Sequence, residues 1–353
     1  MFILCSCHNS EKFTLPTIEE DFMNKSEMTI DGVELNLESA GLKSIYLKDT
    51  IFIVQVWGNQ HYLELYNYPS FSHITDICYK GRAQNEFVND PLNSSAQTYY
   101  KGNDIIIPFV DFESHLREVN ITKSIESGAA KIESNNDCMN LTTGRCIVLN
   151  EGPKHLFCNT FCEYNDYKPR NSTTPKYEYI VDGEVVKRIK VFPSLCKVDD
   201  PGSVGGAYSS SMRKHPRKNL IIQPMQYMDY ILFFDLEAEN YFAIHQSGSS
   251  TYNDNMLSLS DELHFTDATT AENCFLVLYW SGDHNLGLKA RDMERPELMV
   301  FNWSGVFLGS AILGERVSDI EYDENNKRLI GKHAENDKVY CFDLKPFMES
   351  IGL

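Results

Sequence analysis

Short extended segments, paired around turns, are the feature of this sequence that most restricts its fold. The run TIFIVQVW (50–57) precedes HYLELYNY (61–68), and YEYIV (177–181) precedes EVVKRIKVF (184–192). Such runs are apolar or alternate with a period of two, and they are rich in Val, Ile, Tyr and Phe, as β-strands are. The Asp182-Gly183 pair between the last two runs tolerates the positive φ angles of a tight hairpin turn. Because helical periodicity is hard to find, the chain is predicted to be all-β.

The spacing of these segments predicts how they are grouped. Propeller blades repeat every 40–50 residues or so, and each blade is a four-stranded sheet that needs neighbours to bury its faces. The chain has 353 residues, a length that propellers hold as a single domain. We therefore predict one six-bladed β-propeller over residues 28–353, with a pair of β-sandwiches as the alternative. The strand starts that mark the six blades, at a mean spacing of about 55 residues, are Ile51, Ile105, Ile147, Tyr230, Phe275 and Arg328.

A strand-like segment stands before the first predicted blade. It has the sequence MTIDGVELNLE and runs from Met28 to Glu38. Closed rings leave no long unpaired sheet edge, and closure is how a propeller protects its edges. This segment is therefore predicted to pair with the last blade and to latch the ring.

Charge limits the choice of partner. Asp and Glu number 50 against 32 Lys and Arg, which gives a formal net charge of −18. Such a field repels phosphate backbones, so nucleic acid is not an expected partner. The one dense basic run is RKHPRK, Arg213 to Lys218, and it is interpreted as a solvated loop, with an anion or partner contact as the alternative.

The first seven residues, MFILCSC, suggest where the protein resides. Leu4, Cys5, Ser6 and Cys7 resemble the box at which a bacterial lipoprotein signal is cut before the cysteine that becomes lipidated. We expect residues 1–7 to be a signal remnant whose true start lies upstream of Met1, Cys7 to be the lipidation site, and residues 8–27 to be a tether. No run of 18 or more apolar residues occurs, so lipid is the only expected contact with the membrane. An ordinary N-terminus with incidental cysteines is the alternative.

The C-terminal region resembles a known family. LMVFNWSGVFLGSAIL (298–313), followed by VSDIEYDENNKRLIGKHAENDKVYCFDL (317–344), is similar to the closing blades of the six-bladed, TolB-like propellers of many Gram-negative lipoproteins. The resemblance implies a location in the periplasm or at the cell surface, with attachment to a bacterial membrane such as the outer membrane. It indicates a fold and not an activity, because propellers host many unrelated functions.

No motif for catalysis or for a cofactor was found. The segment CNTFC (158–162) lacks the second ligand pair of a zinc site, and GSVGG (202–206) lacks the lysine of a phosphate loop. The histidines are scattered, so no catalytic residue, metal ligand or cofactor is predicted. Eight cysteines beyond the first two leave disulfide pairing open.

The expected function is therefore recognition. Loops that converge on one face of a ring suit the binding or scaffolding of a protein, peptide or glycan at that face or at the axis, by a monomeric protein. One rival is a metal-dependent hydrolase or lactonase with an axial cation held by carboxylates and Asn. A second rival is a secreted eukaryotic glycoprotein, since N-x-Ser/Thr triplets begin at positions that include Asn93, Asn120, Asn140, Asn171 and Asn302.

Overall fold

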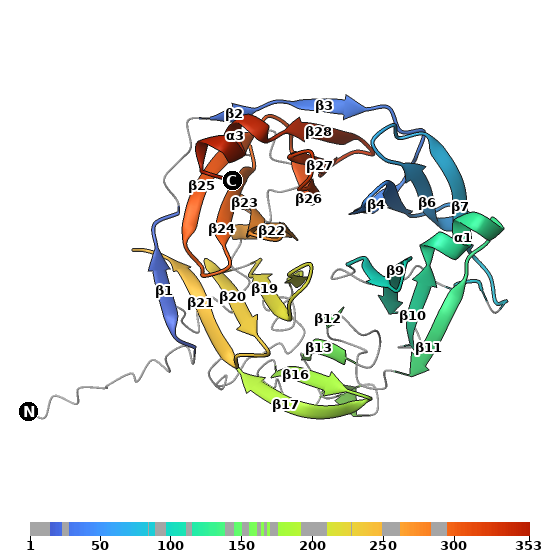
Figure 1. The fold of residues 1–353 in the computed structure, drawn as a ribbon, viewed down its shortest axis with the longest axis horizontal. Coiled ribbons are helices and arrows are strands. Elements are labelled where there is room, and N and C mark those ends of the chain that lie inside the picture. The colour runs from blue at the N-terminus through green and yellow to red at the C-terminus, as the bar shows by residue number, and fades with distance from the viewer. Residues whose placement is uncertain are drawn as a thin grey trace, which may run out of the picture.

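A computed structural model shows a ring of β-sheets around a central axis (Figure 1). Six sheets of four or five strands and one two-stranded hairpin are found among the described residues. The all-β β-propeller prediction is thereby confirmed. The structure describes residues 15–22, 28–83, 85–88, 97–110, 115–137, 145–149, 155–160, 164–165, 168–169, 176–191, 210–226, 228–248, 262–283 and 295–353.

The first three sheets follow the chain in order. Sheet 1 has the order β4-β5-β6-β7, with strands Leu42–Lys48, Ile51–Val56, His61–Asn67 and His73–Tyr79. Sheet 2 has the order β8-β9-β10-β11, with strands Tyr99–Lys101, Asp104–Val110, His115–Asn120 and Ile132–Asp137. Sheet 3 has the order β12-β13-β16-β17, with strands Arg145–Val148, His155–Thr160, Lys176–Val181 and Glu184–Lys190.

Each of the other three sheets takes its outermost strand from the N-terminal segment. Sheet 4 is β18-β19-β20-β21-β1, with strands Arg213–Lys214, Leu220–Pro224, Tyr230–Asp235, Asn240–Gln246 and Thr17–Glu20. Sheet 5 is β22-β23-β24-β25-β2, with strands Glu262–Thr270, Cys274–Asp283, Glu297–Asn302, Phe307–Leu313 and Thr29–Ile30. Sheet 6 is β26-β27-β28-β3, with strands Val317–Asp323, Arg328–His333, Val339–Asp343 and Gly32–Leu35.

Five blades follow a regular pattern, where the sequence predicts six. In sheets 1, 2, 4, 5 and 6, the strands of each blade are consecutive along the chain, apart from the added N-terminal strands. Sheet 3 departs from this pattern because the separate hairpin of β14 (Tyr164–Asn165) and β15 (Lys168–Pro169) interrupts it between β13 and β16. The prediction of six blades is corrected to five, because a separate hairpin breaks the four-strand repeat of sheet 3 in the wide interval between Ile147 and Tyr230.

The predicted Asp-Gly hairpin is present in sheet 3. Strands β16 and β17 pair antiparallel, with Val181 opposite Glu184. Asp182 and Gly183 form the turn with φ angles of 51° and 83°. These left-handed values match the right-handed twist of the paired strands, which explains why this short sequence fixes the register.

Apolar side chains between neighbouring sheets form the core. Val54 of sheet 1 and Ile330 of sheet 6 are fully buried in one such cluster, and Phe233 of sheet 4 and Phe275 of sheet 5 in another. No sheet can bury both of its faces alone, so the ring arrangement follows from this two-sided apolar pattern. Among the described residues, two short helices lie at the periphery: α1 (Ile121–Ser127), with Asn120 as its N-cap, and α3 (Lys345–Ser350). Within the described ranges, no helix has the length and apolar character needed to cross a membrane.

The N-terminal segment closes the ring as predicted. Strand β3 pairs antiparallel with β28, with Val33 opposite Cys341. Two further pairings were not predicted, because β1 and β2 join β21 and β25 in parallel. We call β1, β2 and β3 together the N-terminal strap, which passes along the outer edge of three consecutive sheets (Figure 1).

The strap also corrects the interpretation of residues 8–27 as a tether. Over residues 15–22 the chain is part of sheet 4 or packed against it. Phe22 is fully buried between sheets 4 and 5, where its ring meets Phe301 at 5.6 Å, and the Gln246 side chain accepts a hydrogen bond from its backbone N–H. Residues 1–14, which include Cys7, lie outside the described residues, as do residues 23–27.

Candidate functional site

The innermost strands of four sheets bring charged residues together at the axis. Strands β4, β22 and β26 lie toward the centre of the ring in Figure 1, and β18 is the innermost strand of sheet 4. We call the charged residues of these four strands the axial cluster. The members that this name covers are six of those charged residues, Lys48, Arg213, Lys214, Asp267, Asp319 and Glu321.

Arg213 occupies the middle of the axial cluster and is only 6% exposed. Its guanidinium Nη2 donates to Asp267 Oδ1 at 2.8 Å, and its Nε donates to the Ala268 carbonyl oxygen at 2.7 Å. Burial opposes the charge, yet the carboxylates of Asp267, Glu321 and Asp319 raise the pKa of Arg213. This buried ion pair joins the innermost strands of sheets 4 and 5.

The interpretation of Arg213–Lys218 as a solvated loop is wrong for its first half. Arg213, Lys214 and His215 are buried, whereas residues 216–218 are exposed. The His215 ring lies at the boundary between the buried and the exposed part of this run. Its Nδ1 accepts hydrogen bonds from the backbone N–H groups of Arg217 and Lys218 at 3.0 and 3.2 Å. Burial lowers the pKa of His215, which favours the neutral ring that can accept these bonds.

Acidic side chains connect the innermost strands at two of the junctions between sheets. Asp267 Oδ2 accepts the backbone N–H of Ile320 at 2.9 Å, and Asp319 Oδ2 accepts that of Ile45 at 3.1 Å. The inner edge of a sheet presents backbone groups that have no partner strand, and buried N–H groups need an acceptor. These two carboxyl groups therefore link sheet 5 to sheet 6 and sheet 6 to sheet 1.

Several side chains of the axial cluster have pKa values that are shifted from their ordinary values. Burial and the adjacent Asp267 carboxylate raise the pKa of Asp319 to about 8, and burial raises the pKa of Glu321 as well. Burial lowers the pKa of Lys48, and burial and Lys48 lower the pKa of Lys214 to about 8. Asp319 therefore holds its proton more tightly than a free carboxyl does, and Asp267 is paired with Arg213.

Asp319→Asn should flatten the dependence of stability on pH. A carboxyl whose pKa rises on folding holds its proton more tightly in the folded state, so its stability contribution falls as pH rises from about 4 to about 8. The amide has no such titration and can still accept from Ile45. We expect the free energy of unfolding of the variant to exceed that of the natural protein by several kcal/mol at pH 9, at about 1.4 kcal/mol for each pKa unit, and to match it at pH 4.

Urea titrations at pH 4, 7 and 9 would measure this difference. Glu349→Gln, at an exposed position in α3, is the matched control and should follow the natural protein at each pH. Equal free energies of unfolding for Asp319→Asn and the natural protein at pH 9 would contradict the assignment.

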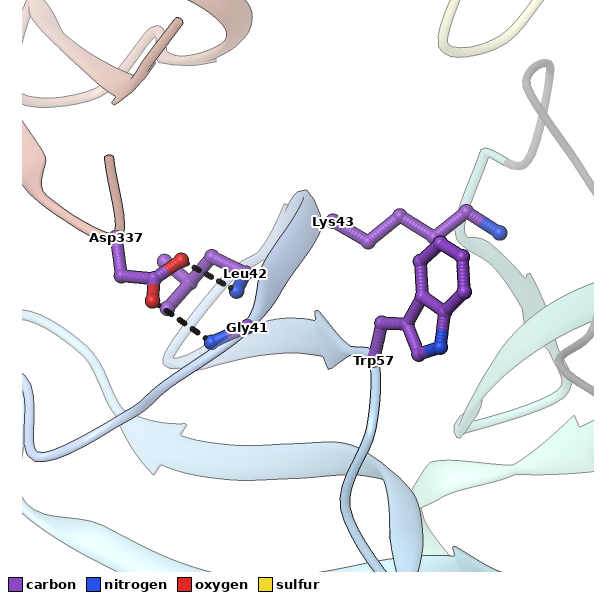
Figure 2. Close-up of a pocket in the computed structure, with 5 residues that line it drawn as sticks. All are labelled: Gly41, Leu42, Lys43, Trp57 and Asp337. Atoms are coloured by element: carbon purple, nitrogen blue, oxygen red, sulfur yellow. Dashed lines mark hydrogen bonds between the residues drawn. The ribbon is translucent and has the colours of Figure 1, made fainter. Parts of the chain in front are cut away.

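A surface hollow lies at the end of the innermost strand of sheet 1. It measures about 470 Å³ and is lined by Gly41, Leu42, Lys43, Trp57 and Asp337. Figure 2 shows the Trp57 indole and the Lys43 side chain on one side and Asp337 on the other. The two backbone N–H groups of Gly41 and Leu42 donate to the Asp337 carboxylate at 2.8 and 2.9 Å. The hollow therefore has one aromatic wall and one fixed anionic wall.

Gly41 places Trp57 at this hollow. The backbone N–H of Trp57 donates to the Gly41 carbonyl oxygen at 2.7 Å, and Gly41 has a φ of 72°. A Cβ atom at Gly41 would lie 2.3 Å from the Trp57 carbonyl oxygen, so only glycine permits this close approach. Trp57 is nevertheless 70% exposed, which is unusual for a large aromatic side chain.

Comparisons with known proteins give matches in structure but not in sequence. No protein-family model matches the chain, and no curated protein does. Among solved structures it is similar to a Bacteroides fragilis protein described as exported, with a TM-score of 0.56 and 10% identity over 93% of this chain and 99% of that one. It is similar to a DUF4221-family member from Bacteroides vulgatus with a TM-score of 0.56 and 12% identity, over 88% and 95% of the two chains. At these identities the likeness shows the propeller fold alone.

The site residue predicted from the sequence and the one found in the structure are different. Cys7 lies outside the described residues, so its lipidation stays a prediction. Trp57 was not predicted as a site residue. Its position directly before the Gly58-Asn59 turn could have indicated an exposed aromatic side chain. Four cysteines in the described ranges are free thiols: Cys78, Cys146, Cys274 and Cys341.

Proposed function

We propose that this protein is a non-enzymatic binding module that recognises a protein, peptide or glycan at the hollow beside Trp57. The observation that carries the proposal is the exposed indole, held by the Gly41–Trp57 backbone bond at the edge of a preformed hollow. Exposed Trp side chains are preferred contact residues because they bury a large apolar area at little cost in side-chain entropy. The Asp337 wall and Lys43 add polar groups that can fix the orientation of a bound molecule.

The axial cluster supports binding over catalysis. The carboxyl groups of Asp267 and Asp319 accept backbone N–H groups, and Asp267 pairs with Arg213, so these two groups are engaged in holding the ring together. A metal-dependent hydrolase or lactonase would need such groups to be available for a cation and a water molecule. Among the described residues at the axis, no observation favours that rival specifically.

The proposal includes a location outside the cytoplasm. The Bacteroides fragilis neighbour is described as exported, and the start of this chain resembles a lipoprotein signal. We propose that the protein is monomeric, that Cys7 carries a lipid anchor, and that the propeller faces the periplasm or the outside of a bacterial cell. The proposal also keeps the resemblance of the closing blades, residues 298–344, to TolB-like propellers.

Replacing Trp57 by alanine should abolish most of the binding. A purified sample would be screened on a glycan array and against a displayed peptide library, and the affinity of each enriched molecule would be measured by calorimetry. Loss of a Trp that dominates an interface costs about 2 kcal/mol or more, which corresponds to roughly 30-fold in Kd. The control is Val186→Ala in β17, an apolar side chain that is also exposed but lies on another sheet. Equal affinities for Trp57→Ala and the natural protein would place the binding surface elsewhere.

A further inference from the structure

Two neighbouring strands of sheet 1 carry the same spacing of a histidine and an acid. Strand β6 contains His61-x-x-Glu64, and strand β7 contains His73-x-x-Asp76. The antiparallel register places Glu64 directly opposite Asp76. Cross-strand partners lie about 5 Å apart, so the pairing brings both acids and their histidines into one group.

The distances within this group are short. His61 Nε2 lies 3.0 Å from Glu64 Oε1, and His61 Nδ1 lies 3.7 Å from Asp76 Oδ2. One ligand atom from each of these three residues can be chosen so that all lie within 4.8 Å of one another. His73 Nε2 lies 2.7 Å from Asp76 Oδ1 and so stands at the outer side of the same group.

We propose that His61, Glu64 and Asp76 form a binding site for a divalent transition-metal ion of the zinc class, with His73 as an additional ligand. Imidazole and carboxylate ligands hold Zn²⁺ at about 2.0–2.2 Å, so two ligand atoms on one tetrahedral ion lie about 3.3 Å apart. The contact of 3.0 Å between His61 Nε2 and Glu64 Oε1 is near that separation, and Asp76 has a carboxylate oxygen within 4.8 Å of both ligand atoms. Hard cations such as Ca²⁺ and Mg²⁺ prefer oxygen ligands, so the two imidazole rings select against them.

Burial and charge support the assignment. Glu64 is a buried carboxylate, and the Tyr66 hydroxyl donates to its Oε2 at 2.8 Å, which leaves Oε1 directed at His61. Such an outer hydrogen bond orients a metal ligand. The two carboxylate charges match those of a divalent ion when both imidazoles are neutral, so binding relieves the cost of two adjacent anions.

The group opens toward the solvent. The side chains of Glu64, His61, Asp76 and His73 are 8%, 16%, 31% and 49% exposed, in that order. An ion can therefore enter past His73 and Asp76 and reach the buried Glu64. The Tyr79 and Tyr66 rings meet the His61 and His73 rings edge-on, at 6.1 and 5.3 Å, and hold them in place.

The proposal is tested with zinc and cobalt(II) added to the purified full-length chain. Because thiolates also bind zinc, the experiment uses a background in which Cys5 and Cys7 are serine. We expect about one equivalent of zinc after dialysis, a rise in Tm on addition of zinc, and a cobalt absorption spectrum of a nitrogen- and oxygen-ligated site. Asp76→Asn and His61→Asn should each weaken zinc binding at least 10-fold and remove the cobalt spectrum.

His333→Asn is the matched control, because His333 lies on sheet 6 and outside this group. It should leave zinc binding and the cobalt spectrum unchanged. Circular dichroism and the melting curve without metal establish that Asp76→Asn is folded, so a loss of binding by a folded variant is specific. Substoichiometric zinc, or equal binding by Asp76→Asn and the natural protein, would show that these residues are only a hydrogen-bonded group. Trp57→Ala should still bind zinc, so this result is independent of the proposed function.

Discussion

Arg213→Met is expected to destabilise the folded protein by about 3–5 kcal/mol, since breaking a buried ion pair by removing one partner leaves an uncompensated charge. Methionine fills a similar volume but has no N–H group. The variant therefore loses the hydrogen bonds of 2.8 Å to Asp267 Oδ1 and of 2.7 Å to the Ala268 carbonyl oxygen. Asp267 would then remain buried beside Asp319 without its cation. Urea denaturation followed by tryptophan fluorescence would give the free energy of unfolding.

The control for this prediction comes from the same basic run. Arg217 contacts Glu272 at 3.1 Å, but its side chain is 79% exposed. Exposed ion pairs contribute about 0–1 kcal/mol, so Arg217→Met should leave the midpoint of denaturation almost unchanged. If both variants were equally stable, Arg213 would not be a structural centre of the axial cluster.

Removal of the N-terminal strap should lower the melting temperature by on the order of 10 °C. Deletion of residues 1–40 exposes the outer edges of β21, β25 and β28 and removes Phe22 from between sheets 4 and 5. Phe22→Ala in the full chain should by itself cost about 3–5 kcal/mol, because a fully buried Phe leaves a large cavity. Thermal melts followed by circular dichroism would measure both effects.

A shorter deletion provides the control for the strap. Deletion of residues 1–14 removes none of the three strap strands, so the melting temperature should stay within a degree or two of that of the full chain. An unchanged melt after deletion of residues 1–40 would rule out the strap as the closing element of the ring.

Local sequence was sufficient for the strands and their hairpins. The alternating runs around Asp182-Gly183 and the pair at 50–68 predict β16, β17, β5 and β6, because each pattern is set by neighbours two residues apart. The pairing of Met28–Glu38 with the last blade could also be predicted, since a closed ring needs a partner for its final edge. The interruption of sheet 3 could not, because no short-range rule locates where a blade departs from its repeat.

The candidate sites depended on contacts between distant residues. Arg213 in a basic run and Asp267 in a strand are 54 residues apart, and nothing local indicates that they pair. The basic run was interpreted as a solvated loop because most charged side chains are solvated. Its neighbours in sequence do not reveal a buried partner that is distant along the chain. Glu64 and Asp76 form a group with two histidines only because β6 and β7 pair in one particular register.

The sequence by itself determined an all-β chain of paired strands whose N-terminal segment closes a ring, because alternation and turn residues act over a few positions. Tertiary structure alone decided which charges are buried at the axis, that Trp57 lies at the edge of a hollow, and that the strap passes along three sheets. These properties arise from the packing of sheets against one another, where burial changes the cost of a charge and brings together residues that are far apart in the chain.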